Sequence, residues 1–289
     1  MKPYLLVVTD FTTSSWLTLS YALVIAKRQR WNIFLAHPFL MDIPPGSNQH
    51  LFDERLKSLT LQGEAKMQAL LASVRLPEGE SLAEWETEIE ITSLVKRGQV
   101  GDVVKELLRG QDIAMIAIDI EGERSWENFF LNDSIFADTG TPVLAIPEGA
   151  PIPKNFDYVV YATRLDDNDE SLIRNLIDFA TTFEAKLDCL HICTDSKKML
   201  EENSKMSDLR TQLGYSLLDT HINFKIVVEK QVRSGLENFL QKQQEKQQRV
   251  DLLVMRKQER NFFARLLNKS LEYGALAQES QVPLLVYRS

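Results

Sequence analysis

The sequence predicts an α/β protein made of two tandem, doubly wound, open parallel sheets of about five strands each. Three observations support this fold class. The chain has 289 residues, which is enough for two domains that each bury a core. Apolar runs of strand length alternate with helical patterns, as they do in parallel βαβ units. The second half of the chain also repeats the first.

The repeat is clearest at the start of each half. A single shift of 154 positions places Thr9 on Thr163 and His37 on His191 without a gap. Apolar positions between these residues also agree, so the same faces are apolar in both copies. The ends of the halves correspond at a different offset, through residues 131–134 and 267–270 and through residues 142–144 and 283–285.

A proline-rich segment separates the two copies. Pro147, Pro151 and Pro153 cannot donate hydrogen bonds to a helix or a sheet. We therefore predict domains at residues 1–147 and 158–289, joined by a linker at 148–157. Because each copy ends in an apolar strand whose edge needs covering, we expect the domains to pack as an intramolecular pseudo-dimer. The sequence leaves open whether the chain also forms a homodimer.

Continuous apolar runs predict buried parallel strands, and apolar side chains at helical spacing predict the helices between them. The predicted strands of the first half cover residues 4–9, 33–37, 113–118 and 143–146. Strands of the second half are predicted at 186–194, 252–255 and 284–287. Helices are predicted around residues 16–26, 52–74 and 172–180.

Composition excludes several classes of partner. The formal net charge is -8, and no basic run is interleaved with aromatic residues, so we expect no nucleic-acid binding. No segment approaches the roughly 18 to 20 consecutive apolar residues that span a bilayer, so we expect no membrane partner. The N-terminal residues lack the pattern of a signal peptide, and we therefore expect a cytoplasmic protein. Its protein partners cannot be named from the sequence.

The two cysteines form the pattern Cys189-x-His191-x-Cys193, which superficially resembles a zinc site. The pattern lies in a predicted strand, where residues four apart are separated by about 13 Å. Two thiolates that each lie about 2.3 Å from one zinc ion cannot be so far apart. We therefore expect buried thiols and no metal.

In a doubly wound sheet, ligands bind at the carboxyl ends of the strands, where the chain order reverses. Asp10 ends the first strand, a loop follows the fourth strand, and Ser134 opens the last helix before a Pro-Val-Leu strand. This order resembles the universal stress protein family, twice over nearly the whole chain, and especially its glycine-poor tandem members. The resemblance implies an adenine nucleotide alpha hydrolase-like fold and a dimer that pairs the last strands.

The glycines of the family's phosphate loop are missing. Nucleotide-binding members have the pattern Gly-x2-Gly-x9-Gly-Ser/Thr, in which backbone amides approach the phosphates without an intervening Cβ. Counted back from Ser134 and Ser270, the glycine positions hold Ile120, Glu123 and Asp133 in the first half and Arg256, Glu259 and Lys269 in the second. We therefore expect no bound cofactor, and ATP in particular is disfavoured.

Candidate ligand residues remain at both crevices, and a basic loop favours the second half for any anion. They are Asp10 and Ser134 in the first half and Arg164, Arg256, Lys257, Lys269 and Ser270 in the second. Asp10 either faces a ligand or caps the next helix, and the serines have the alternative role of helix N-caps. The histidines have no nucleophile or orienting carboxylate among their sequence neighbours, so we predict no catalytic residues.

The serines also set the expected length of each last helix. Ser134 lies eight residues before Pro142, whereas Ser270 lies thirteen before Pro283. The last helix of the first half should therefore be shorter by about one and a half turns.

Two functions follow from these residues. The first is a non-enzymatic universal stress-type protein, a stress-response or regulatory scaffold whose nucleotide crevices are degenerate. The alternative is a small-molecule, nucleotide or anion-binding module that holds an ATP-like or AMP-like ligand with at most slow hydrolysis.

Overall fold

The computed structural model of the chain divides into two compact units, Met1–Glu148 and Gly149–Ser289. The residues that the structure describes are 2–12, 14–42, 46, 48–74, 85, 88–120, 140–152, 154–166, 168–214, 222–257 and 281–288.

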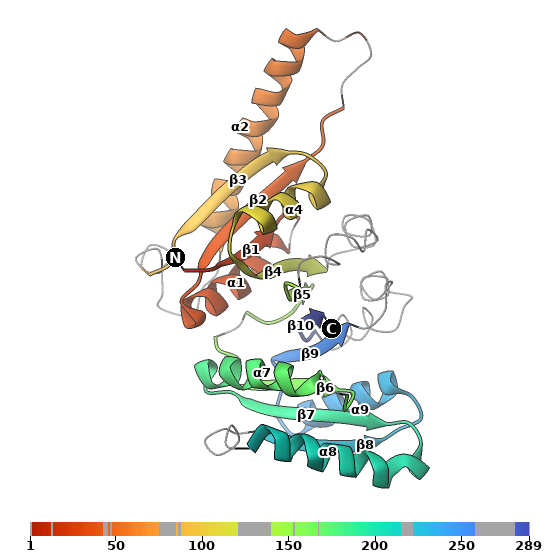
Figure 1. The fold of residues 1–289 in the computed structure, drawn as a ribbon. Coiled ribbons are helices and arrows are strands. Elements are labelled where there is room, and N and C mark those ends of the chain that lie inside the picture. The colour runs from red at the N-terminus through yellow and green to blue at the C-terminus, as the bar shows by residue number, and fades with distance from the viewer. Residues whose placement is uncertain are drawn as a thin grey trace. The chain divides into compact units, whose positions relative to one another are not determined.

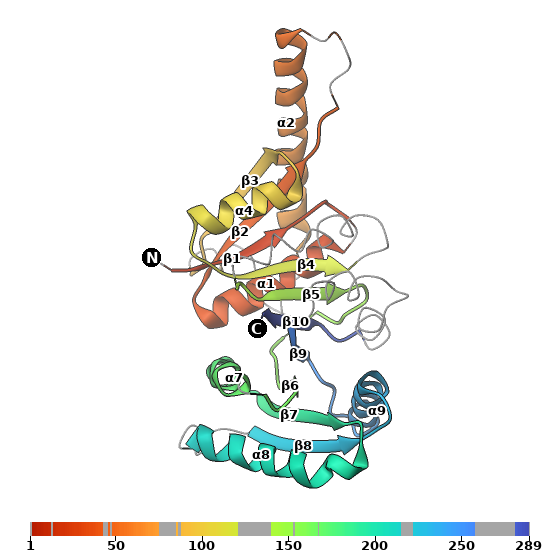
Figure 2. The same ribbon diagram turned by 45° about the vertical axis from the view of Figure 1, so that its right-hand side comes forward.

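The first unit is a parallel sheet with helices on both faces (Figure 1). Its strands lie in the order β3-β2-β1-β4-β5, and α1 and α2 contact each other on one face while α4 packs over β2 on the other (Figure 2). Its elements are β1 (Tyr4–Val8), α1 (Ser15–Gln29), β2 (Asn32–Phe39), α2 (Gln49–Ser73), β3 (Ile91–Arg97), α4 (Val100–Gly110), β4 (Ile113–Ile120) and β5 (Val143–Pro147).

The second unit has the same architecture. Its strand order β8-β7-β6-β9-β10 corresponds strand by strand to that of the first unit, so the predicted fold class and the repeat are confirmed. Its elements are β6 (Tyr158–Thr163), α7 (Asp169–Phe183), β7 (Lys186–Cys193), the short 3-10 helix η1 (Ser196–Lys198), α8 (Met199–Leu213), β8 (Ile222–Val228), α9 (Val232–Glu245), β9 (Leu252–Lys257) and β10 (Leu284–Arg288).

Two strands run further than the sequence indicates. Asp119 and Arg256, which we predicted to begin loops, belong to β4 and β9 and are 2% and 6% exposed. The register explains the difference, because Asp119 pairs with Ile146 of β5 and Arg256 pairs with Tyr287 of β10. Both charged side chains are therefore held inside the fold rather than in solvated loops.

The long helix α2 was predicted from its apolar spacing, and its buried face is the predicted one. Gly63, Met67 and Leu70 are buried, whereas Phe52 and Leu56 nearer the N-terminus of the helix are half-buried. Gly63 allows a close approach to β3: a Cβ at this position would lie 2.5 Å from Cγ1 of Val95. The close packing of helix α2 on β3 therefore requires a residue without a side chain at position 63.

Two predictions, the lengths of the last helices and the pseudo-dimer, are not tested by the structure. The last helices, with Ser134, Lys269 and Ser270, fall in residues 121–139 and 258–280, outside the described residues. Their lengths stay a prediction, and so does the pseudo-dimer. Among the helices that are described, none is both long enough and apolar enough to cross a membrane.

The close approach at Gly63 yields a stability prediction. Gly63→Ala should destabilise the first unit by about 1–3 kcal/mol, because the new methyl group collides with a packed valine. Gly110→Ala is the matched control, since a Cβ there meets nothing within 4 Å, and we expect it to be neutral or slightly stabilising. All four tryptophans lie in the first half of the sequence, so tryptophan fluorescence in urea reports this unit alone. Equal stability of the two variants would contradict the described packing of α2 on β3.

Candidate functional site

The candidate site lies where the chain order reverses in each sheet. The reversal falls between β1 and β4 in the first unit and between β6 and β9 in the second. Doubly wound proteins bind their ligands in this crevice, at the carboxyl ends of the strands. The residues that the two units place there are therefore the first to consider for function.

Both crevices begin with the same strained turn. The hydroxyl oxygen of Thr9 accepts a hydrogen bond of 3.0 Å from the backbone N–H of Phe11, and Thr163 accepts one of 3.0 Å from Leu165. Phe11 and Leu165 have φ angles of 63° and 58°, in the left-handed region that costs a residue with a side chain about 1–2 kcal/mol. The threonine hydroxyl holds each turn in this conformation.

The two threonines also fix the two histidines. Nδ1 of His37 lies 2.8 Å from the carbonyl oxygen of Thr9, and Nδ1 of His191 lies 3.0 Å from that of Thr163. Since a carbonyl can only accept, each Nδ1 carries a proton and donates it. The backbone thus sets the orientation of both imidazole rings.

In the first unit, hydroxyl groups surround a buried carboxylate. Thr12 and Ser14 donate hydrogen bonds of 2.6 and 3.1 Å to Oδ2 of Asp119. Asp10 is half-buried, and its Oδ1 accepts a 3.0 Å hydrogen bond from the backbone N–H of Thr12. Asp10 therefore stabilises a turn and does not cap α1, whose N-cap residue is Ser14. The capping role that we considered for Asp10 is wrong.

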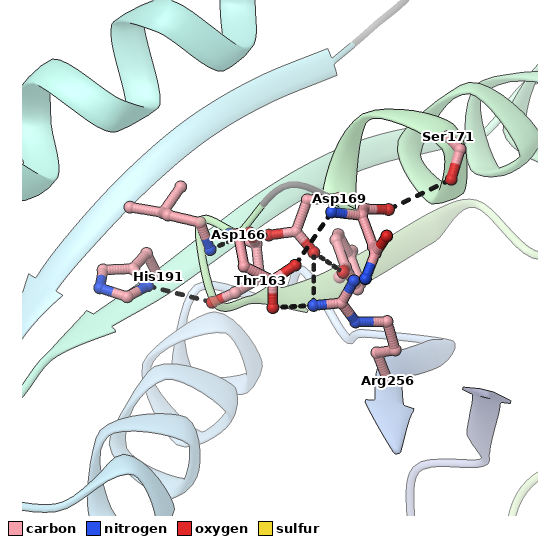
Figure 3. Close-up of polar contacts among 9 residues, drawn as sticks. Thr163, Asp166, Asp169, Ser171, His191 and Arg256 are labelled. Atoms are coloured by element: carbon pink, nitrogen blue, oxygen red, sulfur yellow. Dashed lines mark hydrogen bonds and ion pairs between the residues drawn. The ribbon is translucent and has the colours of Figure 1, made fainter. Parts of the chain in front are cut away.

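In the second unit, the strand contributes a cation, Arg256, where the strand of the first unit contributes the carboxylate of Asp119. The side chain of Arg256 is 3% exposed, and its Nη2 donates to Oδ2 of Asp166 and lies 3.7 Å from Oδ1 of Asp169 (Figure 3). Asp169 is fully buried and also accepts hydrogen bonds from the hydroxyl groups of Tyr161 and Thr163, the latter at 2.5 Å. A guanidinium and two carboxylates therefore occupy the centre of this crevice.

The two clusters are versions of one framework. The 154-residue shift places Ser15 on Asp169, and Thr9 donates to Ser15 at 3.0 Å just as Thr163 donates to Asp169. Asp119 and Arg256 are each the penultimate residue of the strand across the reversal. The first unit thus has a strand carboxylate with hydroxyl groups from the β1–α1 loop, and the second has a strand guanidinium with carboxylates from the β6–α7 loop and the start of α7.

The ion pair determines the protonation states in the second cluster. Burial alone would raise the pKa of Asp166, but the hydrogen bonds from Arg256 and from the backbone of Asn168, together with the charges of Arg256 and Arg164, lower that pKa below its usual value. Burial, reinforced by the charge of Asp169, raises the pKa of Tyr161 far above its usual value. Tyr161 therefore stays a hydrogen-bond donor, and Asp166 stays ionised.

One part of the guanidinium has no acceptor. Nε and Nη1 of Arg256 are buried, and none of the described residues accepts a hydrogen bond from them. A buried donor without an acceptor costs about 1–3 kcal/mol, so this side of the guanidinium favours an additional acceptor such as water or an anion.

The structure brings only some of the predicted residues together. Arg164 is exposed, and no described residue forms an ion pair with it, although its charge contributes to lowering the pKa of Asp166. Lys257 is the last residue of β9, and only its backbone is described. Sequence reasoning missed Asp166 and Asp169. The repeat could have indicated Asp169, because it places this carboxylate on Ser15 beside the crevice.

Metal ligation has no support in the described part of the chain. No group of three or more histidine, cysteine, aspartate or glutamate side chains there is arranged to hold a metal ion. Cys189 and Cys193 are free thiols buried on β7, and burial strongly raises the pKa of Cys189.

The fold and the position of its polar clusters define a doubly wound α/β protein of the kind that places its site at the strand reversal. The universal stress protein family model matches residues 155–288, which is nearly all of the second unit. The second unit is therefore similar to the universal stress protein family, and the resemblance seen in the sequence is confirmed. No curated protein sequence matches the chain.

Solved structures share the fold over both units. A universal stress protein from Archaeoglobus fulgidus matches with a TM-score of 0.64 at 14% identity, covering 99% of this chain and 96% of that chain. The cytoplasmic domain of a prokaryotic cation chloride cotransporter matches with a TM-score of 0.56 at 10% identity, covering 99% and 95%. A putative universal stress protein from Pseudomonas aeruginosa gives 0.51 at 12% identity, covering 99% and 92%. Because the sequence identities are only 10–14%, these similarities show a shared fold and nothing more.

The buried ion pair yields a second prediction. Arg256→Met should destabilise the second unit by about 3 kcal/mol or more, because it leaves the buried carboxylate of Asp169 without its cation. Arg164→Met removes the same charge from an exposed neighbour and should change stability by less than about 0.5 kcal/mol. Hydrogen-exchange mass spectrometry of β6 measures the unfolding of this unit. Similar losses in both variants would show that the ion pair does not organise the unit.

The lowered pKa of Asp166 yields a third testable prediction, on the pH dependence of stability. The folded chain binds this proton more weakly than the unfolded chain, so the stability from ionised Asp166 is fully present above the unfolded pKa of 3.8 and is lost as the pH falls through the lower pKa of the folded state. The stability advantage of the wild-type protein over Asp166→Asn should therefore shrink progressively as the pH is lowered past 3.8. The same exchange measurement tests this, with Asp178→Asn on the exposed face of α7 as control. An advantage that is the same at pH 3 as at pH 6 would contradict the assignment.

Proposed function

We propose that the protein is a non-enzymatic, cytoplasmic universal stress-type protein that acts as a regulatory scaffold for protein partners. One observation carries the proposal: the centre of the second crevice is occupied by the ion pair of Arg256 with Asp166 and Asp169. The chain's own side chains thus take the place in which the family's nucleotide-binding members would hold a ligand.

Electrostatics supports this view in both units. Arg256 is the residue that we align with the first glycine of the phosphate loop, and its single positive charge faces two carboxylates. A triphosphate would enter a cluster with a formal charge of about -1 and would compete with carboxylates that are already in place. In the first unit Asp119 carries the negative charge, and the hydroxyl groups of Thr12 and Ser14 donate to it rather than to a ligand.

The absence of catalysis is part of the proposal. Hydrolysis at this crevice would need a base aligned with a nucleophile or with an activated water. Both histidines use Nδ1 to hold a backbone carbonyl. Within the described ranges, neither imidazole receives a hydrogen bond from a hydroxyl group or a thiol.

A specific observation favours the alternative, a nucleotide or anion-binding module. Nε and Nη1 of Arg256 need an acceptor, and an anion would provide one. Arg164, Lys257, Lys269 and Ser270 would be its further ligands, so an anion should prefer the second unit to the first.

Calorimetry with magnesium and ATP separates the two functions. The scaffold predicts no binding with a dissociation constant below about 100 μM, for the steric and electrostatic reasons above. Mass spectrometry of the denatured protein, which should release no nucleotide, ensures that the crevice is not already filled. Micromolar binding would contradict the scaffold.

Two matched variants locate any binding that is found. Arg256→Glu reverses a charge inside the cluster, and Arg164→Glu reverses one on its exposed rim. Binding abolished by Arg256→Glu and retained in Arg164→Glu would establish the alternative function. Binding that survives Arg256→Glu would place the ligand outside the second crevice and would overturn both functions as stated.

A further inference from the structure

The outer edge of the first sheet carries backbone groups that no described strand pairs with. β3 is the outermost strand of the first unit (Figure 1). The backbone N–H and carbonyl of Glu90, just before β3, both bond to β2, and the N–H of Gly98, just after it, does the same. Since the backbone direction alternates along a strand, the odd-numbered residues between them direct their N–H and carbonyl groups outward. These residues are Ile91, Ser93, Val95 and Arg97.

The edge lacks the usual protection against pairing with another strand. Proteins protect sheet edges with bulges, prolines and charged side chains, especially lysine. β3 has seven residues, contains no proline and pairs with β2 in one continuous register. Its middle residue is Leu94, whose side chain is half-buried. This edge is therefore of the kind that accepts a further strand.

The corresponding edge of the second unit does carry a lysine. Leu94 pairs with Ala36 of β2, and Lys225 of the outer strand β8 pairs with Leu190 of β7. Because the 154-residue shift places Ala36 on Leu190, Lys225 is the equivalent of Leu94. The ammonium of Lys225 lies 2.6 Å from Oδ2 of the fully buried Asp188. A lysine in the middle of an outer strand opposes pairing, so the two units differ at their edges.

The charges at the two ends of β3 are complementary. Glu88 and Glu90 precede the strand, whereas Lys96 and Arg97 end it. Parallel pairing of two copies would bring like charges together, but antiparallel pairing brings the acidic start of each copy beside the basic end of the other. Lys96 has a partner in its own chain, Glu106 at 2.5 Å, while none of the described carboxylates pairs with Arg97. The strand is therefore complementary to a second, antiparallel copy of itself.

One register of such a pair satisfies all of the outward backbone groups. In antiparallel strands, residues that face the partner must lie opposite one another to exchange hydrogen bonds. A twofold axis at Leu94 meets this condition. Ile91 then lies opposite Arg97 of the other copy, and Ser93 lies opposite Val95. Any shift from this register leaves outward groups at the strand ends without a partner.

A groove beside the edge offers apolar surface for the same contact. It lies between α2 and β3, has a volume of about 450 Å³, and is lined in part by Leu61, Ala65, Ser93 and Val95. Leu61 is 55% exposed, which is unusual for a large apolar side chain. In the antiparallel pair, Val95 of the second copy would lie opposite Ser93, at the open side of this groove. The pairing would thus cover apolar surface as well as backbone groups.

We propose that β3 pairs with β3 of a second copy of this chain, antiparallel and about a twofold axis at Leu94. The resulting homodimer continues the first sheet across the interface. Its contact is distinct from the pairing of the last strands that we expect within one chain. The proposal goes beyond the scaffold function and does not depend on whether the crevice holds a ligand.

The residue at the axis tests the proposal in the full-length chain. Sedimentation equilibrium should show a reversible monomer–dimer equilibrium for the wild type. Leu94→Lys, which introduces the residue of the second unit, and Leu94→Glu should each raise the dissociation constant at least about tenfold, because like charges meet at the axis. An equimolar mixture of the two variants should dimerise again, because the lysine then faces the glutamate. Leu94→Met keeps an apolar side chain and should dimerise like the wild type.

Two outcomes of sedimentation would overturn the proposal. One is a wild-type chain that stays monomeric at about 1 mM. The other is a set of folded variants, verified by circular dichroism, in which both charged substitutions leave the dissociation constant unchanged. A dimer that returns only in the mixture would show that both variants are folded and that the axis passes through position 94.

Hydrogen exchange with single-residue resolution locates the interface without any substitution. The amides of Ser93 and Val95 should exchange at least about tenfold more slowly above the dissociation constant of the dimer than below it, because only the dimer gives them an acceptor. The amides of Leu94 and Lys96 face β2 in both states and should not change. A dimer in which Ser93 and Val95 remain unprotected would place the interface elsewhere and overturn the proposal.

Discussion

The ion pair of Arg256 with Asp166 and Asp169 is the constraint on which the second crevice depends. A fully buried carboxylate such as Asp169 is tolerated only when a cation or several hydrogen-bond donors face it, and here both are present. The ion pair joins β9 to the loop after β6 and to the first turn of α7. It thereby fixes Thr163, and through the carbonyl of Thr163 it fixes His191 as well.

The first unit shows that the backbone framework does not require this particular charge. Its threonine turn, its left-handed residue and its histidine contact are the same, yet Asp119 stands in the strand and hydroxyl groups stand opposite. Both clusters carry a formal charge of about -1 in a place that favours phosphate in nucleotide-binding relatives. The fold therefore supports two chemically opposite ways of filling one crevice, which agrees with the rule that function resides in sites rather than in folds.

Sequence patterns predicted most of the fold and only part of the site. Apolar periodicity located the strands and α2, because burial on both faces of a parallel sheet dictates the residue types. Asp119 and Arg256 were placed in loops, because a charge at the end of an apolar run usually marks the end of the strand. The carboxylate partners of Arg256 lie about ninety residues away, and Glu202 reaches His191 from a separate helix. No local pattern encodes contacts over such distances.

The loss of the glycine pattern and the gain of the ion pair are physically coupled. A glycine at position 256 would let the backbone approach a phosphate, but it would also leave Asp166 and Asp169 without the cation that holds them. Those carboxylates would then repel the phosphate that the glycine admits. Opening the crevice to a phosphate would therefore require changes on both β9 and α7, and each change alone would cost stability or affinity. A single substitution at Arg256 or at one of its carboxylates disrupts the ion pair without making room for an anion.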